Sequence, residues 1–198
     1  MASYDPETAL VVVDVQNDFA EPAGSLWVRG GAELIPFLNA QILGALDAGA
    51  FVVYSQDWHP AHTPHFAQDG GVWPVHCVQG TWGAALHPDL VQAGPVVRKG
   101  ANGEDGYSAF TMRDPVSDET VPTDLEALLL ERDLRRVVVA GLATDYCVRA
   151  TALDSLGLGF GTTVLTQGIR AVDVQPGDGS RAIAEMAQAG ATIDDAAA

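Results

Sequence analysis

The sequence is poor in cysteine and in basic residues, and each shortage excludes a class of protein. Only two of its 198 residues are cysteine, Cys77 and Cys147, too few for the disulfide framework of a small secreted domain. Lysine and arginine number 10 against 26 aspartates and glutamates, which gives a net charge of −16. So acidic a surface repels phosphate groups, which argues against nucleic acid and anionic membranes as partners.

The sequence also lacks an apolar run of about eighteen residues, the length that spans a membrane. Its N-terminal segment MASYDPETALVVVD has no basic start and no long apolar stretch before a cleavage site, so it does not read as a secretory signal. We therefore expect a cytoplasmic protein whose cysteines can stay reduced and whose partner is a small molecule.

The length and the apolar content favour one globular domain. Hydrophobic residues make up 47% of the chain, which excludes disorder as the main state. A chain of 198 residues fits a single domain. We expect residues 1–198 to form one domain with its core at about residues 9–193 and with short frayed termini, among them the tail DDAAA.

Strand-like and helix-like segments alternate along the chain. Short apolar runs rich in β-branched residues predict strands over 9–14, 50–57, 96–99, 137–142 and 162–166, with an edge strand at 191–193. Helical spacing predicts helices over 31–48, 123–133, 145–156 and 179–189. A capping box of Thr123 and Glu126 is expected to start the second of these helices. The pattern predicts an α/β fold, a Rossmann-like three-layer sandwich with a mostly parallel sheet and helices on both faces.

Two long segments, 58–95 and 100–121, lack this periodicity. Long irregular segments inside a compact domain are usually functional. The first contains all five histidines of the chain, namely His59, His62, His65, His76 and His87.

Reactive side chains stand at the predicted strand ends, where such sheets bind their ligands. Asp14, Asp57 and Lys99 close the first three strands, and Cys147 opens the helix after the fourth. We expect the fold to gather these four residues at one edge of the sheet.

Cys147 lies in GLATDYCV, at a predicted helix start. Free N–H groups and the helix dipole there are expected to lower the pKa of the thiol and to face a developing oxyanion. From position alone, a buried structural cysteine is an equally good interpretation. Cys77, in a loop beside His76, is interpreted as structural.

Asp14 and Lys99 support either of two interpretations. Beside Cys147, the carboxylate would take the proton of the thiol and the lysine would hold the charges together; otherwise the two would form a structural ion pair. Asp18, in the same DVQNDF segment, is interpreted as a turn or helix-cap residue.

The oxygen and imidazole groups after the second strand predict a metal site. Asp57, His59, His65 and His76 are ligands that zinc, iron or manganese accepts, whereas the alternative is a set of surface histidines. His62 and His87 are weaker candidates. The GDGSRA segment at 177–182 fits a dinucleotide pattern but does not follow the first strand, so no nucleotide cofactor is expected.

Four segments, taken in order, resemble those of the nicotinamidases, within the isochorismatase-like cysteine hydrolases. The resemblance runs from about Leu10 to Ile193, and its segments are DVQNDF from Asp14, QDWHPAHTPHF at 56–66, RKG at 98–100 with YSAF from Tyr107, and GLATDYCV at 141–148.

The resemblance implies a role for each matching residue. Cys147 would be the nucleophile, Asp14 the general base and acid, and Lys99 the third catalytic member. A cis peptide before Ala143 would aim the N–H groups of Ala143 and Cys147 at the oxyanion. The metal ligands would be Asp57, His59 and His76, and His65 matches a further histidine that ligates in only some members. The aromatic residues around the substrate ring would be Phe19, Trp73 and Tyr107.

The activity that the resemblance implies is hydrolysis of nicotinamide to nicotinate and ammonia, a step of NAD salvage, with pyrazinamide as a second substrate. One divalent metal ion is implied, zinc before iron or manganese, and the oligomeric state is left open. The alternatives are a related amidohydrolase acting on an N-carbamoyl or maleamate-type amide, whose family members generally lack the metal histidines, and a metal-binding regulatory module without turnover. Isochorismatase itself is disfavoured because Cys147 is present.

Overall fold

The computed structural model of the chain describes residues 4–195. The predicted fraying of the two ends concerns residues 1–3 and 196–198, which lie outside the described part. Within the described part, no helix has both the length and the apolar character needed to cross a membrane.

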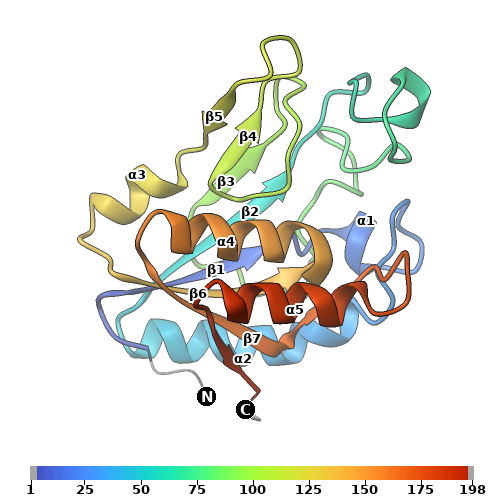
Figure 1. Cartoon of the computed structure of the whole chain (residues 1–198). Helices are drawn as coiled ribbons and strands as arrows, with labels where there is room; N and C mark the ends of the chain where they lie inside the picture. The colour runs from blue at the N-terminus through green and yellow to red at the C-terminus, as the bar shows by residue number, and fades with distance from the viewer. Residues whose placement is uncertain (1–3, 196–198) are drawn as a thin grey trace.

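A six-stranded parallel sheet forms the centre of the molecule, which confirms the predicted α/β class (Figure 1). The strand order is β3-β2-β1-β6-β7-β8, and every adjacent pair is parallel. The strands are β1 (Thr8–Val13), β2 (Phe51–Asp57), β3 (Val96–Lys99), β6 (Arg136–Leu142), β7 (Gly161–Arg170) and β8 (Thr192–Asp194).

Helices cover both faces of this sheet, as the continuous apolar strands predict. Along β1, Leu10 and Val12 pack in the apolar cluster that contains the buried side of α2, whereas Val11 and Val13 pack in the cluster of the other three helices. These helices are α2 (Ile35–Asp47) on one face and α3 (Leu125–Leu130), α4 (Arg149–Gly157) and α5 (Asp178–Gln188) on the other.

The order of the strands fixes where a ligand can bind. The chain runs outward from β1 to β2 and β3, and then returns to place β6 on the other side of β1. This reversal between β1 and β6 is a topological switch point, beside which α/β sheets bind their ligands. Asp14 follows β1, and the segment containing Cys147 follows β6.

Several short elements were not predicted. They are the four-residue helix α1 (Asn17–Ala20), the 3₁₀ turns Ala32–Leu34 and Ala67–Asp69, the π-helical turn Thr144–Val148, and an antiparallel hairpin of β4 (Thr111–Arg113) and β5 (Thr120–Pro122). The hairpin lies within the second segment that appears irregular in the sequence.

The predicted capping box is wrong. The helix α3 begins at Leu125, and no side chain caps it in the way that the box requires. The Thr123 hydroxyl instead donates to the carbonyl of Ala109 at 2.6 Å and accepts the N–H of Leu125 at 3.1 Å. Thr123 therefore ties the start of α3 to the loop before β4.

Candidate active site and metal cluster

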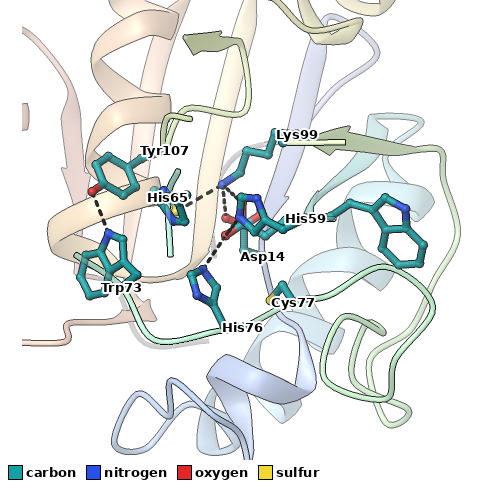
Figure 2. A network of polar contacts seen from close by, with 12 residues as sticks. Asp14, His59, His65, Trp73, His76, Cys77, Lys99 and Tyr107 are labelled. Atoms are coloured by element: carbon teal, nitrogen blue, oxygen red, sulfur yellow. Dashed lines mark hydrogen bonds and ion pairs between the residues drawn. The ribbon is translucent and has the colours of Figure 1, made fainter. Parts of the chain in front are cut away.

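Lys99 lies at the centre of the four strand-end residues, which the structure brings together as expected (Figure 2). Its Nζ is 2.9 Å from Oδ2 of Asp14, 2.5 Å from Oδ1 of Asp57 and 3.4 Å from Sγ of Cys147. Lys99 and Asp57 are direct partners in the β2–β3 register, so the parallel pairing itself sets this contact. All four side chains are buried.

The backbone turns sharply at Asp14 to bring its carboxylate to the site. Its φ of 47° lies in the left-handed region, which non-glycine residues adopt rarely and aspartate more readily than most. The Ser55 hydroxyl donates to Oδ1 of Asp14 at 2.7 Å, and Lys99 occupies the other carboxylate oxygen.

The two carboxylates beside Lys99 have opposite pKa shifts. Burial raises the pKa of Asp14, although Lys99 opposes the shift. Burial acts on Asp57 too, but Lys99, His59 and His76 together outweigh it and hold the pKa of Asp57 well below its ordinary value. Burial also opposes the charge of Lys99, yet Asp14 and Asp57 raise its pKa well above the ordinary value. Asp14 is thus the carboxylate suited to accept a proton, while Asp57 remains ionised.

The predicted fall in the pKa of Cys147 is wrong. Burial raises the pKa of its thiol well above the ordinary value, and only Lys99 opposes this among the larger causes. The free N–H groups at a helix start favour the thiolate, but the cost of removing a charged sulfur from water is larger at this buried position. A protonated thiol beside Asp14 needs a base before it can attack, whereas a preformed thiolate would not.

Three histidines form a second cluster beside the first. One ring nitrogen each from His59, His65 and His76 lies within 4.8 Å of the others, and all three side chains are buried. His76 Nδ1 donates to the carbonyl of Pro74 at 2.7 Å, and His65 Nδ1 is 2.6 Å from a carboxylate oxygen of Asp105. Because carbonyls and carboxylates only accept hydrogen bonds, His65 and His76 each carry hydrogen on Nδ1 and keep Nε2 as the nitrogen with a free lone pair.

The cluster fits a divalent metal ion. Both ring nitrogens of His59 are buried without a hydrogen-bond partner, which is costly unless one of them binds an ion. The Oδ2 atom of Asp57 is 3.8 Å from Nε2 of His59 and 3.8 Å from Nε2 of His76. These distances are too long for hydrogen bonds, but they suit ligand atoms that each lie about 2.1 Å from one shared metal ion.

A cavity opens between the two clusters. Eight of the predicted site residues line it, namely Phe19, Asp57, His65, Trp73, His76, Tyr107, Ala143 and Cys147. The remaining predicted residues, Asp14, His59 and Lys99, are buried and do not line the cavity. The peptide bond between Leu142 and Ala143 is cis, as the resemblance implies.

Sequence reasoning missed part of the cavity wall. Leu26, Val28, Tyr146 and Val172 also line it. Tyr146 packs edge-on against Trp73 at 4.9 Å and Tyr107 at 5.3 Å between ring centroids, and Trp73 Nε1 donates to the Tyr107 hydroxyl at 3.0 Å. The aromatic character of Tyr146, next to the nucleophile candidate, was the available signal.

The weaker candidates have other partners. Asp18 accepts the N–H groups of Ser25 and Cys77, consistent with its interpretation as a turn residue, and Cys77 is fully buried. His62 is exposed and contacts Asp69, and His87 donates to Glu21 at 2.6 Å.

Residues 8–198 match the family described as the Isochorismatase domain. The chain belongs to this family.

Known members of the family resemble the chain over nearly its whole length. The nicotinamidase of Escherichia coli (strain K12) is 40% identical over 95% of this chain and 94% of its own length. The crystal structure of the pyrazinamidase of Pyrococcus horikoshii in complex with zinc superposes with a TM-score of 0.85 at 39% identity, over 96% of this chain and 99% of that one. The crystal structure of PnC1 from L. infantum in complex with nicotinate superposes with a TM-score of 0.87 at 36% identity, over 98% of this chain and 95% of that one.

Proposed function

We propose that the protein is a nicotinamidase, which hydrolyses nicotinamide to nicotinate and ammonia and also deamidates pyrazinamide. The observation that carries the proposal is the position of one aromatic-walled cavity between two clusters. A cysteine with a buried Asp–Lys pair lies on one side of the cavity, and a set of imidazoles with a carboxylate lies on the other.

In the first half-reaction, Asp14 takes the proton of Cys147 as the sulfur attacks the carboxamide carbon. The raised pKa of Asp14 suits this role, and Lys99 keeps the combined charge of the pair balanced. The N–H groups of Ala143 and Cys147 stabilise the tetrahedral oxyanion. Asp14 then gives its proton to the departing ammonia, which leaves a thioester on Cys147.

In the second half-reaction, Asp14 removes a proton from water as the water oxygen attacks the thioester carbon. Collapse of the second oxyanion breaks the carbon–sulfur bond, and Cys147 regains its proton from Asp14. The acid product gives its remaining hydroxyl proton to solvent and leaves as nicotinate, so the site returns to its starting charge. Phe19, Trp73 and Tyr107 flank the ring throughout.

The metal ligands in this proposal are Asp57, His59 and His76, with His65 as a fourth. A divalent ion bound there, zinc in preference to iron or manganese, supplies a Lewis-acid position for the nitrogen of the pyridine ring. Support comes from the zinc in the P. horikoshii pyrazinamidase and the nicotinate in L. infantum PnC1. We propose further that the chain acts as one domain in the cytoplasm, with a small-molecule substrate and without nucleic acid or membrane as a partner.

The experiment that tests the proposal is ammonia release from nicotinamide by the purified protein, before and after treatment with a strong chelator. We expect turnover that the chelator removes and that added Zn²⁺ restores. Release of ammonia from maleamate or an N-carbamoyl amide, with none from nicotinamide, would overturn the proposal in favour of the relatives with those activities, such as the maleamate amidohydrolase of Pseudomonas putida, which is 26% identical.

A further inference from the structure

The two long segments of the chain are joined by side-chain hydrogen bonds, three of which link residues 63–73 to residues 103–107, while a fourth runs from Gln79 Nε2 to the Ala101 carbonyl at 2.7 Å. The hydroxyl of Thr63 donates to the Gly103 carbonyl at 3.3 Å, and Nδ1 of His65 donates to Oδ1 of Asp105 at 2.6 Å. The third contact is the hydrogen bond from Trp73 to Tyr107 described above, which Figure 2 shows beside His65. The middle contact is the one that reaches the histidine cluster.

The carboxylate of Asp105 is held in place by its own segment. Its backbone forms an isolated antiparallel bridge with Arg113, with hydrogen bonds in both directions at 2.8 and 2.6 Å. The N–H of Gly106 donates to the same Oδ1 at 2.7 Å. Hence Asp105 is held by contacts with β4 and Gly106 that do not involve His65.

The two partners lie in different environments. The side chain of His65 is 5% exposed and that of Asp105 is 49% exposed. Since a carboxylate can only accept, the contact fixes His65 as the tautomer with hydrogen on Nδ1 and leaves Nε2 free. The His65 ring stacks on His59 at 4.8 Å and lies 5.3 Å from His76, so its orientation determines whether the three rings face one centre.

We propose that Asp105 is a positioning residue for the metal site, which acts by holding His65 in the orientation and tautomer of a ligand. The inference rests on the proposed function. Ligating histidines commonly donate their second ring N–H to a carboxylate, which orients the ring and raises its basicity. Of the three histidines, His65 is the one whose second nitrogen contacts a charged side chain; His76 uses a backbone carbonyl, and His59 has no partner.

The proposal assigns a function to a segment that the sequence leaves unexplained. Asp105 stands two residues before Tyr107, which lines the cavity. The Asp105–His65 contact therefore links the metal ligands to the segment that bears one wall of the substrate cavity.

The test compares Zn²⁺ affinity, measured by competition with a fluorescent chelator, in the full chain and in three variants. Asp105→Ala removes the contact, and we expect a loss of about 10- to 100-fold in affinity. Asp105→Asn keeps an accepting oxygen without the charge and should lose less. Glu104→Ala is the matched control, because the neighbouring carboxylate bonds only to Asn102 and should leave the affinity within about twofold.

Two further readouts separate positioning from a general structural effect. The visible spectrum of the Co²⁺-loaded protein should change in Asp105→Ala and stay unchanged in Glu104→Ala. In a His65→Ala background, Asp105→Ala should cost little further Zn²⁺ affinity, because the residue through which it acts is gone.

Full Zn²⁺ affinity in Asp105→Ala would overturn the inference, and so would an equal loss of Zn²⁺ affinity from Asp105→Ala in the wild-type and His65→Ala backgrounds. Neither result would overturn the proposed nicotinamidase activity. A wild-type protein that binds no Zn²⁺ would overturn the metal site and this inference together.

Discussion

A single side chain, Asp57, belongs to both clusters of the site. Its Oδ1 atom pairs with Lys99, and its Oδ2 atom faces His59 and His76. The ionised state that these neighbours impose on Asp57 serves both partners, since a protonated carboxyl would leave the buried lysine with Asp14 alone. The nucleophile side and the metal side therefore meet at one carboxylate.

Replacement of Cys147 by alanine tests the nucleophile. We expect Cys147→Ala to fold normally, because it deletes one buried sulfur, and to lose at least about a thousandfold in rate. Ammonia release and the melting temperature check the two parts of the expectation. Activity within about tenfold of wild type would exclude covalent catalysis through this thiol.

The raised pKa of the Cys147 thiol also predicts how it reacts without substrate. A thiol whose pKa lies above its ordinary value is protonated at neutral pH, and only the thiolate reacts with iodoacetamide. Alkylation of Cys147 in the resting protein should therefore be slower than that of a free thiol at pH 7 and should accelerate as the pH rises. Faster alkylation than a free thiol at neutral pH would show a preformed thiolate instead.

Lys99→Met removes the cation between two buried carboxylates. We expect the loss of activity together with a loss of about 3–5 kcal/mol in the free energy of unfolding at neutral pH. If Lys99 were only structural, the variant would be unstable but active per folded molecule.

The pH dependence of that stability loss follows from the signs of the shifts. The raised pKa of Lys99 means that its contribution is complete below its unfolded value of about 10.4, so it is constant between about pH 4 and 8. Without the cation, the pKa of Asp14 rises further above its unfolded value of about 3.9, because Lys99 no longer opposes the effect of burial, so the variant loses stability as the pH rises above that value. Denaturation of both metal-free proteins should show that the difference in the free energy of unfolding between wild type and Lys99→Met narrows from pH 7 towards pH 4. A difference that stays constant over this range would contradict the account.

At the scale of elements, the end of β3 carries a glycine that allows the close approach of two segments. Gly100 has a φ of +79°, and a Cβ there would lie 2.6 Å from atoms of the His59 ring. We expect Gly100→Ala to displace His59 and to weaken Zn²⁺ binding by about tenfold or more, measured by chelator competition.

Gly103 provides the matched control for that substitution. Its φ is +92°, so alanine suffers a similar backbone strain there, but the nearest atom to a Cβ is the Thr63 hydroxyl oxygen at 3.8 Å. Gly103→Ala should lose stability without losing Zn²⁺ affinity. Equal affinity losses in both variants would show that strain, and not displacement of His59, is the cause.

The parallel sheet explains why much of the site could be predicted from sequence. Asp14, Asp57 and Lys99 each end a buried apolar strand, and parallel pairing places such ends at one edge whatever the loops do. The β2–β3 register then makes Asp57 and Lys99 neighbours. The fold class and the convergence of these residues follow from local patterns.

The rest depends on contacts between distant segments. No local pattern distinguishes Asp105 within the segment GANGEDG, and its bridge to Arg113 of β4 places it beside His65. The pKa of Cys147 was predicted in the wrong direction because burial comes from the whole packed site, whereas a helix start is local. The Thr123 hydroxyl does accept the Leu125 N–H at the start of α3, but the Thr123 N–H pairs with the distant Phe110 carbonyl, so the return contact from Glu126 that a capping box needs is not made.

At the scale of the whole molecule, the cavity separates bond breaking from ring recognition. Cys147 and Ala143 border it from the β6 side, while His65, His76 and Asp57 border it from the β2 side. In the proposed function, a substrate that meets both sides would have its amide at the sulfur and its ring nitrogen towards the histidines. A site built around one polar contact rejects an analogue that lacks it far more strongly than an apolar pocket rejects a missing methylene.

The most direct test of this account is the ratio of kcat/KM for nicotinamide and benzamide, which presents a C–H in place of the ring nitrogen. For the metal-loaded protein we predict a preference for nicotinamide of at least about a hundredfold. His76→Ala should weaken nicotinamide turnover and narrow that ratio, because neither substrate then gains from the metal side. Equal kcat/KM for the two amides in the metal-loaded wild type would contradict the assignment of the histidine cluster to substrate recognition.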